Sequence, residues 1–103
     1  MDIKDLETNA DDASELLKAM SNQTRLLILC QLLDGEKTAG QLDSDTNLSQ
    51  SALSQHLAIL RTHGLVTTRR EAQHIFYQLS GDRPKAIIEV LHRLFNSETV
   101  KCA

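Results

Sequence analysis

Apolar residues recur along this chain mostly at the three- and four-residue spacings of helices, and glycine and proline rarely interrupt them. A first helix is predicted to begin near Asp11 or Asp12, because an aspartate side chain can cap a helix N-terminus. Its apolar side carries Leu16, Leu17 and Met20. A short additional helix can precede it near the N-terminus. The pattern therefore predicts that the chain begins with helical structure.

The second predicted helix is apolar around nearly its whole circumference. Ser21-Asn22 can cap its N-terminus, and Asp34-Gly35 can end it, since glycine readily adopts the left-handed conformation that follows many helices. We expect this helix to be buried on most sides, because it has no polar face that would prefer water. Its apolar residues are Leu26, Leu27, Ile28, Leu29, Cys30, Leu32 and Leu33.

Capping residues predict two further helices, separated by a short turn. Thr38 and Gln41 have the spacing of a capping box, in which each residue bonds the backbone N–H of the other. This box opens a short helix that runs to about Thr46. Ser49 can cap the next helix, and Gly64 can end it.

The helix after Ser49 divides into an apolar and a polar face. At about 100° per residue, Leu53, Leu57 and Leu60 fall on one face. Leu48, before the cap, can pack on Leu53 as a hydrophobic staple. The opposite stripe consists of small uncharged residues, namely Ser51, Ser54, Gln55, Ala58 and Thr62. The leucine face predicts packing on the domain, and the polar stripe predicts exposure.

The pattern then changes from helix to strand. Residues 65–79 are rich in Val, Thr, Ile, Phe and Tyr, and polar residues interrupt them near the middle. They predict a two-stranded hairpin, Leu65 to Arg70 and His74 to Leu79, with its turn near Glu71 and Ala72. The tip of this hairpin is polar and basic.

A last helix is predicted from Pro84, which suits a first helical turn. Its apolar stripe is Ile87, Ile88, Leu91, Leu94 and Phe95. The predicted fold class is therefore mainly α with a small β-hairpin wing, in the order ααααββα. A short helix, a tight turn and a second helix followed by a hairpin form a winged helix-turn-helix. We expect one domain over residues 1–103, with the helix-turn-helix at about 38–64, the wing at about 65–79 and the last helix at about 83–96.

This arrangement gives the polar stripe a use. Serine, glutamine and threonine can donate to and accept from base edges and phosphates, and a helix fits a major groove about 12 Å wide. Arginines beside the helix and near the hairpin tip can reach phosphates or an adjacent minor groove. The predicted DNA-binding residues are Ser49, Gln50, Ser51, Ser54, Gln55, His56, Arg61, Thr62, Arg69 and Arg70. The competing interpretation is an ordinary solvated face, which fits the serines but not the basic hairpin beside them.

Charge distribution supports the DNA hypothesis, although the net charge of −3 does not. Residues 1–48 hold ten acids and four bases, whereas the rest of the chain holds seven bases and four acids. A local basic surface is what phosphate contact needs, and the charge of the whole chain is a poor guide to it.

Length and composition limit the other function classes. With 103 residues, 41% of them hydrophobic, the chain can form one modest core, which dimerisation would help to stabilise. It contains neither a membrane-length apolar run nor a signal peptide, so we expect no membrane contact and a cytoplasmic location. No phosphate-binding glycine loop or catalytic constellation is present, and we expect neither enzymatic activity nor a cofactor.

Three segments resemble one known family. "LLKAMSNQTRLLILCQL", "LSQSALSQHLAILRTHGLVTTRREAQHIFYQL" and "VLHRLF" are similar to the ArsR family of bacterial winged helix-turn-helix regulators, most closely its HlyU/BigR-like branch, over roughly residues 13–95. The resemblance implies a homodimer that binds imperfect inverted repeats in promoters and pairs through its first and last helices. The implied interface is Leu16, Leu17, Ile87, Ile88, Leu91, Leu94 and Phe95.

Metal sensing, which many members of the family carry out, is not expected here. The resemblance would place a thiolate-rich site near Thr38 to Asp43, and the segment "TAGQLD" contains no cysteine. Glu89 and His92 lie one turn apart on the last helix, but a lone pair is more often a surface contact than half of a metal site. We therefore assign no metal ligands.

The HlyU/BigR-like branch instead implies a sulfur or redox sensor with two cysteines. Cys30 matches the first of them, whereas Asn96 stands where the second is expected, and Cys102 follows six residues later. A flexible tail could bring Cys102 to Cys30, since a disulfide needs Cα atoms within about 7 Å. The alternative is that both thiols are inert. The chain would then be an effector-free architectural or anti-silencing protein that competes with another DNA-binding protein.

Overall fold

The computed structural model describes residues 3–46 and 49–99. Along the chain it contains α1 (Ile3–Met20), α2 (Gln23–Leu32), β1 (Lys37–Thr38), α3 (Ala39–Thr46), α4 (Gln50–Thr62), β2 (Val66–Glu71), β3 (His74–Leu79) and α5 (Arg83–Thr99). The predicted mainly helical fold with a hairpin wing is confirmed. The staple between Leu48 and Leu53 cannot be followed, because Leu48 lies outside the described residues.

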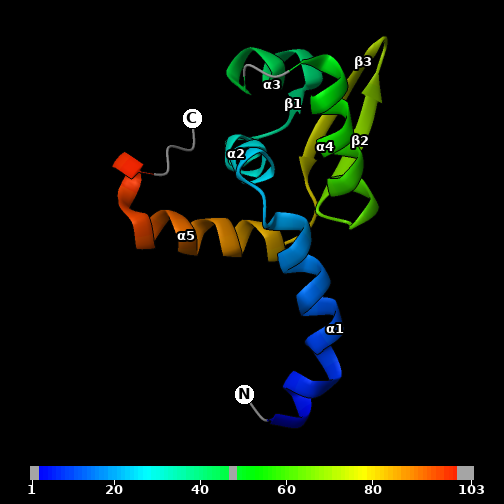
Figure 1. Cartoon of the computed structure of the whole chain (residues 1–103). Coiled ribbons are helices and arrows are strands. Elements are labelled where there is room, and N and C mark those ends of the chain that lie inside the picture. Colours follow the sequence, from blue (N-terminus) through cyan, green and yellow to red (C-terminus); the bar gives the residue numbers. More distant parts are fainter. Residues whose placement is uncertain (1–2, 47–48, 100–103) are drawn as a thin grey trace.

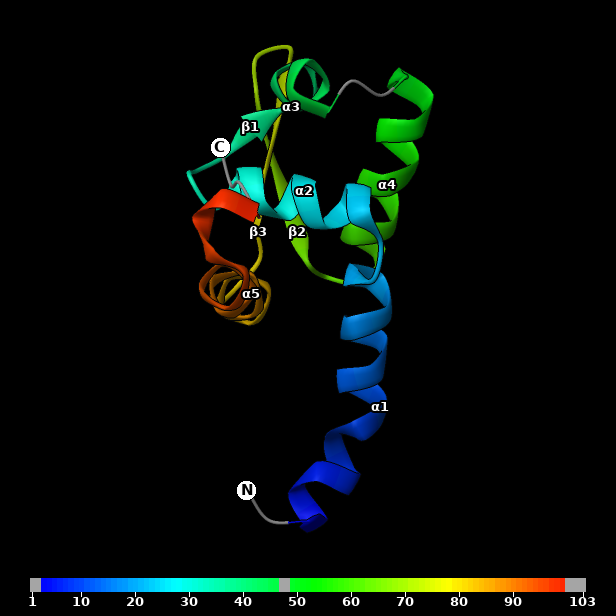
Figure 2. The same ribbon diagram turned by 60° about the vertical axis from the view of Figure 1, so that its left-hand side comes forward.

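The central helix is α2, which contacts α1, α3, α4, α5 and β3. Figure 2 shows it crossing the middle of the molecule between α4 and α5. Its burial explains why it is apolar all round: Ile28, Leu29 and Cys30 expose at most 1% of their surface. The core continues into the leucines of α4 and into Leu65 and Val66, so the helices and the wing share one core.

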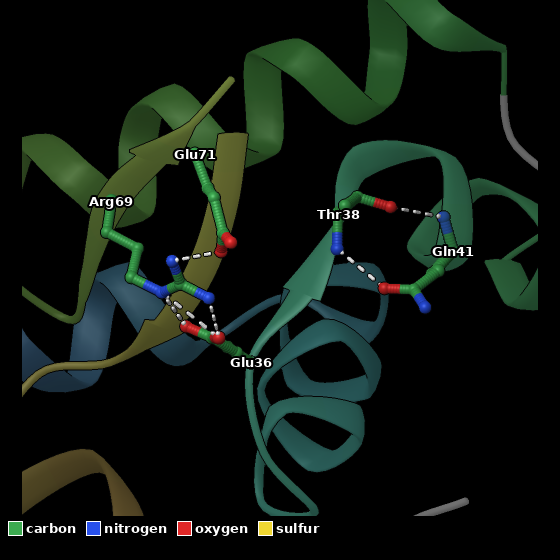
Figure 3. Close-up of polar contacts among 5 residues, drawn as sticks. All are labelled: Glu36, Thr38, Gln41, Arg69 and Glu71. Atoms are coloured by element: carbon green, nitrogen blue, oxygen red, sulfur yellow. Dashed lines mark hydrogen bonds and ion pairs between the residues drawn. The ribbon is translucent and has the colours of Figure 1, made fainter. Parts of the chain in front are cut away.

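The predicted N-terminal caps of α2 and α3 and the predicted glycine stop after α4 are present. Asn22 caps α2 by accepting a hydrogen bond from the Arg25 backbone N–H at 3.1 Å. The capping box at the start of α3 is complete. The Thr38 N–H donates to Gln41 Oε1 at 2.8 Å, and the Gln41 N–H donates to Thr38 Oγ1 at 3.2 Å (Figure 3). Gly64 ends α4 in a left-handed conformation with φ 73°.

The first helix differs from its prediction. The sequence favours a start near Asp11 or Asp12 with a separate short helix before it, but α1 is one continuous helix from Ile3. The two aspartates lie inside the helix and cap nothing. Local bonds support the polar first half: the side chains of Thr8 and Asn9 donate to backbone carbonyls four residues earlier, at 2.9 and 2.8 Å. In both views α1 projects well beyond the body of the molecule (Figures 1 and 2).

The sheet has one strand more than the sequence predicts. Its order is β1-β3-β2, and both pairings are antiparallel. The additional strand β1 pairs Lys37 with Tyr77 and Thr38 with Phe76, so the wing is hydrogen-bonded to the segment that opens α3. The hairpin turn lies at Ala72 and Gln73, one residue later than expected, because Glu71 still pairs with His74.

Candidate nucleic-acid interface

Helix α4 presents the two faces that its sequence predicts. Leu53, Leu57 and Leu60 expose 1%, 2% and 0% of their surface and hold the helix to the core. The opposite side is exposed: Ser51, Ser54, Gln55, Ala58, Arg61 and Thr62 all lie in solvent. Ser49 and Gln50, at the start of the helix, are also exposed, and Ser49 Oγ accepts a bond from the Ala52 N–H at 3.2 Å. A row of small hydrogen-bonding groups is therefore available along one face of a firmly held helix.

His56 has a different position from the rest of the predicted set. It is half-buried, and its Nδ1 lies 3.5 Å from Nη1 of Arg25. This histidine therefore lies where α4 meets the start of α2, and Arg25 in turn donates through Nε to the carbonyl of Ala19, near the end of α1, at 2.6 Å. His56 therefore contacts another side chain of the protein, unlike the exposed residues of the predicted set.

Sequence reasoning missed one residue of this surface. Ile59 exposes 38% of its surface on α4, beyond the polar stripe. The helical period contains a signal for it, since at about 100° per residue Ile59 lies about 120° around the helix from Leu53 and so outside the buried leucine face.

The two arginines of the wing have different surroundings, although the sequence predicts phosphate contacts from both. Arg69 donates through Nε to Glu36 Oε2 at 2.8 Å, pairs with Glu36 a second time through Nη2, and donates through Nη1 to Glu71 at 2.8 Å (Figure 3). Its guanidinium carbon lies 4.5 Å from the centre of the Phe76 ring. Hydrogen bonding by Arg69 lowers the pKa of the Glu36 carboxyl, and Glu36 and Glu71 raise the pKa of Arg69.

Arg70 lies on the other face of β2, because side chains alternate along a strand. It is exposed, and among the described residues no ion pair involves it. The tip of the wing lies at the end of the molecule where α3 lies and α4 begins, away from α1 (Figure 1). The exposed face of α4 and the wing tip can therefore meet one extended partner.

A second exposed surface is apolar and lies on α1 and α5. Leu17, Leu94 and Phe95 expose 56%, 71% and 53% of their surface, and Leu16, Ile87 and Leu91 are partly buried. Ile88 corrects the predicted stripe: it exposes 1% and belongs to the protomer's own core. Val90, which the prediction omits, exposes 40% and lines an open apolar cleft with Ala86, Ile87 and Leu91. The exposed apolar stripe of α5 is therefore displaced around the helix axis from its predicted position: Ile88 faces the core, and Val90 faces solvent.

The predicted thiol pair can be followed only in part. Cys30 exposes 1% of its surface within α2, and Cys102 lies outside the described residues. Within residues 3–46 and 49–99, no three His, Cys, Asp or Glu side chains are grouped to hold a metal ion. Glu89 and His92 line a shallow cleft with Leu33 and Arg93. No helix in the described part of the chain is long and apolar enough to cross a membrane.

Comparison with known proteins gives consistent matches. The family model "Bacterial regulatory protein, arsR family" matches residues 22–68. The transcriptional activator HlyU of Vibrio cholerae is 58% identical over 95 residues, which span 92% of this chain and 88% of that protein. The structure of the transcriptional repressor BigR from Xylella fastidiosa has a TM-score of 0.86 at 36% identity, covering 92% of this chain and 97% of that one.

A third match concerns assembly. A homodimeric winged helix-turn-helix DNA-binding domain from Mycobacterium bovis has a TM-score of 0.79 at 25% identity, covering 90% of this chain and 86% of that one. These matches confirm the resemblance to the HlyU/BigR-like branch and the winged helix-turn-helix fold. The relatives are transcriptional regulators, and they include both an activator and a repressor.

Proposed function

Because the chain belongs to the arsR family of bacterial regulatory proteins, we propose that it is a homodimeric transcriptional regulator that binds double-stranded DNA. The observation that carries this proposal is the exposed face of α4, where small hydrogen-bonding side chains stand on a helix anchored by three buried leucines. The wing tip lies at the same end of the molecule (Figure 1). Helix α4 would read base edges in a major groove, with Ser51, Ser54 and Gln55 nearest to the bases.

The surface area of the chain supports a dimer. The protomer exposes 7057 Å², whereas a compact monomer of this size is expected to expose about 5800 Å². Its Cα radius of gyration is 14.4 Å, against an expectation of about 12.8 Å for a compact domain of this length. Burying Leu17, Val90, Leu94 and Phe95 against a second copy would remove the exposed apolar surface.

A two-fold dimer would set the form of the operator. Two copies of α4 would enter successive major grooves on one side of the duplex, with their centres ~34 Å apart. The operator would then be an inverted repeat whose half-sites are about one helical turn apart. The Mycobacterium bovis domain, which is described as homodimeric, supports this assembly by likeness.

Selection from a random-sequence duplex library tests the proposal. The protein should enrich an inverted repeat with the spacing given above, and should bind it at least about a thousandfold more tightly than a scrambled duplex at physiological salt. Enrichment of no motif, or equal affinity for the selected and scrambled duplexes, would contradict sequence-specific regulation. Equal, non-specific binding would favour an architectural protein that competes with other DNA-binding proteins.

We further propose that thiol chemistry at Cys30 and Cys102 switches DNA binding. The supporting observation is the position of Cys30 in α2, the helix that contacts α4, α5 and β3. A sulfane-sulfur donor would convert the Cys30 thiol to a persulfide and leave as its own thiol, and attack by the Cys102 thiolate on the Cys30 sulfur would form a disulfide and release hydrosulfide. This disulfide would strain the contacts of α2 with α4 and α5. Because Cys30 exposes only 1% of its surface, the protein must open locally before this thiol can react.

The thiol proposal is tested separately from DNA binding. Treatment with a sulfane-sulfur donor should yield a species in which Cys30 and Cys102 are linked, detected by mass spectrometry, and this species should bind the selected duplex with altered affinity. The Cys102→Ser protein is the control, which should keep its affinity after treatment. Unchanged affinity of the linked species would leave the regulator without this switch.

A further inference from the structure

Arg69 and Arg70 are adjacent basic residues on the wing, but only one of them is placed to meet DNA. We infer that Arg69 is a positioning residue that fixes the wing on the domain, and that Arg70 makes the wing's phosphate contact. This inference rests on the proposed DNA-binding function, and it assigns the two arginines of that surface to different tasks.

Arg69 crosses the sheet. It starts on β2 and ends at Glu36, the residue before β1 (Figure 3). Its guanidinium lies over the ring of Phe76 on β3. In the strand order β1-β3-β2, these contacts reach from β2 across β3 to the residue that precedes β1. Arg69 and Phe76 lie on the same face of the sheet because they are direct cross-strand partners. The side chain is therefore a strap from the wing to the segment that opens α3.

The charge of Arg69 is already neutralised. Glu36 accepts hydrogen bonds from Nε and Nη2 and Glu71 accepts one from Nη1, so two carboxylates surround one guanidinium. A phosphate approaching this face would meet a local excess of negative charge. The phosphate would also have to displace a bidentate arginine–carboxylate pair, which is stronger than a single neutral hydrogen bond.

Arg70 has the opposite arrangement. It shares its face of β2 with the buried Val66, which packs into the core that α4 joins. Arg70 itself lies beyond that core, near the tip, and is exposed. Its cross-strand partner is Ile75, which brings no charge to compete for the guanidinium. It is therefore the wing arginine that a backbone phosphate can reach beside α4.

Salt dependence of DNA binding separates the two roles. The dissociation constant for the duplex selected from the random library is measured by fluorescence anisotropy over a range of salt concentrations. The variants are Arg69→Gln, Glu36→Gln and their combination, with Arg70→Gln as the matched control on the neighbouring position. Thermal unfolding of each variant checks that the fold is kept.

Log affinity falls with log salt, and loss of one phosphate contact makes this fall shallower by about 0.9. We expect this change, once for each protomer, in Arg70→Gln. Arg69→Gln and Glu36→Gln should each weaken binding about two- to fivefold at fixed salt and leave the slope unchanged. The combined variant should be no weaker than either single one, because both act through one ion pair. A lowered slope for Arg69→Gln, or tighter binding by Glu36→Gln through release of a DNA-contacting arginine, would overturn the assignment.

Hydrogen exchange tests the strap without DNA. The backbone amides of β1 and β3 should exchange faster in Arg69→Gln and in Glu36→Gln than in Arg70→Gln, because only the first two changes remove the link across the sheet. Equal exchange in all three would overturn the strap even if the protein binds DNA. Failure to select any duplex would instead count against the proposed function, and the exchange result would still decide the strap.

Discussion

Leu94 offers the most direct test of the proposed dimer. It exposes 71% of its surface on α5, in a helix whose opposite edge is anchored by Ile88 at 1%. If a second copy covers this part of α5, truncation of Leu94 to alanine removes apolar contact from the dimer. The same change removes little from the protomer, because most of the side chain contacts no other part of its own chain. Leu94→Ala should therefore weaken dimerisation while keeping the fold.

The size of the effect follows from the exposed fraction. Full burial of a leucine side chain is worth about 1.5–3 kcal/mol, so burial of the exposed 71% is worth ~1–2 kcal/mol. A two-fold interface contains the residue twice, which gives ~2–4 kcal/mol for the dimer. At about 1.4 kcal/mol for each factor of ten, the dimer dissociation constant should rise between about 30-fold and 700-fold.

Sedimentation equilibrium over a range of protein concentrations measures this constant. Ile75→Ala is the matched control, since Ile75 is also an exposed apolar residue, at 42%, but lies on the wing. Its dimer constant should not change. An unchanged constant for Leu94→Ala, or an equal loss for Ile75→Ala, would refute the placement of the interface on α5. A fall in melting temperature comparable to that of a core truncation would show that Leu94 is not free of its own core.

Three further changes test the reading face, the wing turn and the wing ion pair. Gln55→Ala should lower the preference for the selected duplex over a scrambled one by about tenfold or more, with an unchanged melting temperature; normal discrimination would refute the readout face. Ala72→Gly should raise the free energy of unfolding by up to about 1 kcal/mol in denaturant titrations, because Ala72 has φ 55°, whereas Gln73→Gly in the same turn should lower it. The pKa of Glu36 is lowered from its ordinary value of 4.5, so its stabilising effect is complete above that value and is lost as pH falls through the lowered pKa. Glu36→Gln should therefore reduce the loss of stability on acidification, and an identical pH profile would contradict the ion pair's contribution.

Local signals in the sequence predicted most of the helical framework. The caps at Asn22, Thr38 and Ser49 could be found because each is a bond between residues three positions apart. The division of α4 into two faces could be found because it depends only on helical period. The start of α1 was predicted wrongly because the segment between Leu6 and Leu16 has no large apolar residue, so Asp11 and Asp12 resembled the N-terminal cap of a new helix.

Features that depend on distant partners could not be predicted. β1 contains two residues and exists because β3, far along the chain, offers its edge. Arg69 looks like its neighbour Arg70 in the sequence, and only the fold brings Glu36, 33 positions away, against it. Ile88, expected in the interface stripe, lies in the core, and Val90, for which no position was predicted, is exposed, because the packing of the whole protomer decides which side of α5 faces the core.

The small strand β1 has a mechanical consequence. It joins the wing to the residues that open α3, and the shared core joins the wing to α4, so the parts proposed to touch DNA are connected to one another at several points. They would be difficult to move separately. A signal would then alter DNA binding mainly by changing the distance and angle between two such units across the dimer. The size of the signal's effect on DNA affinity should then depend on the spacing between half-sites more than on their sequence.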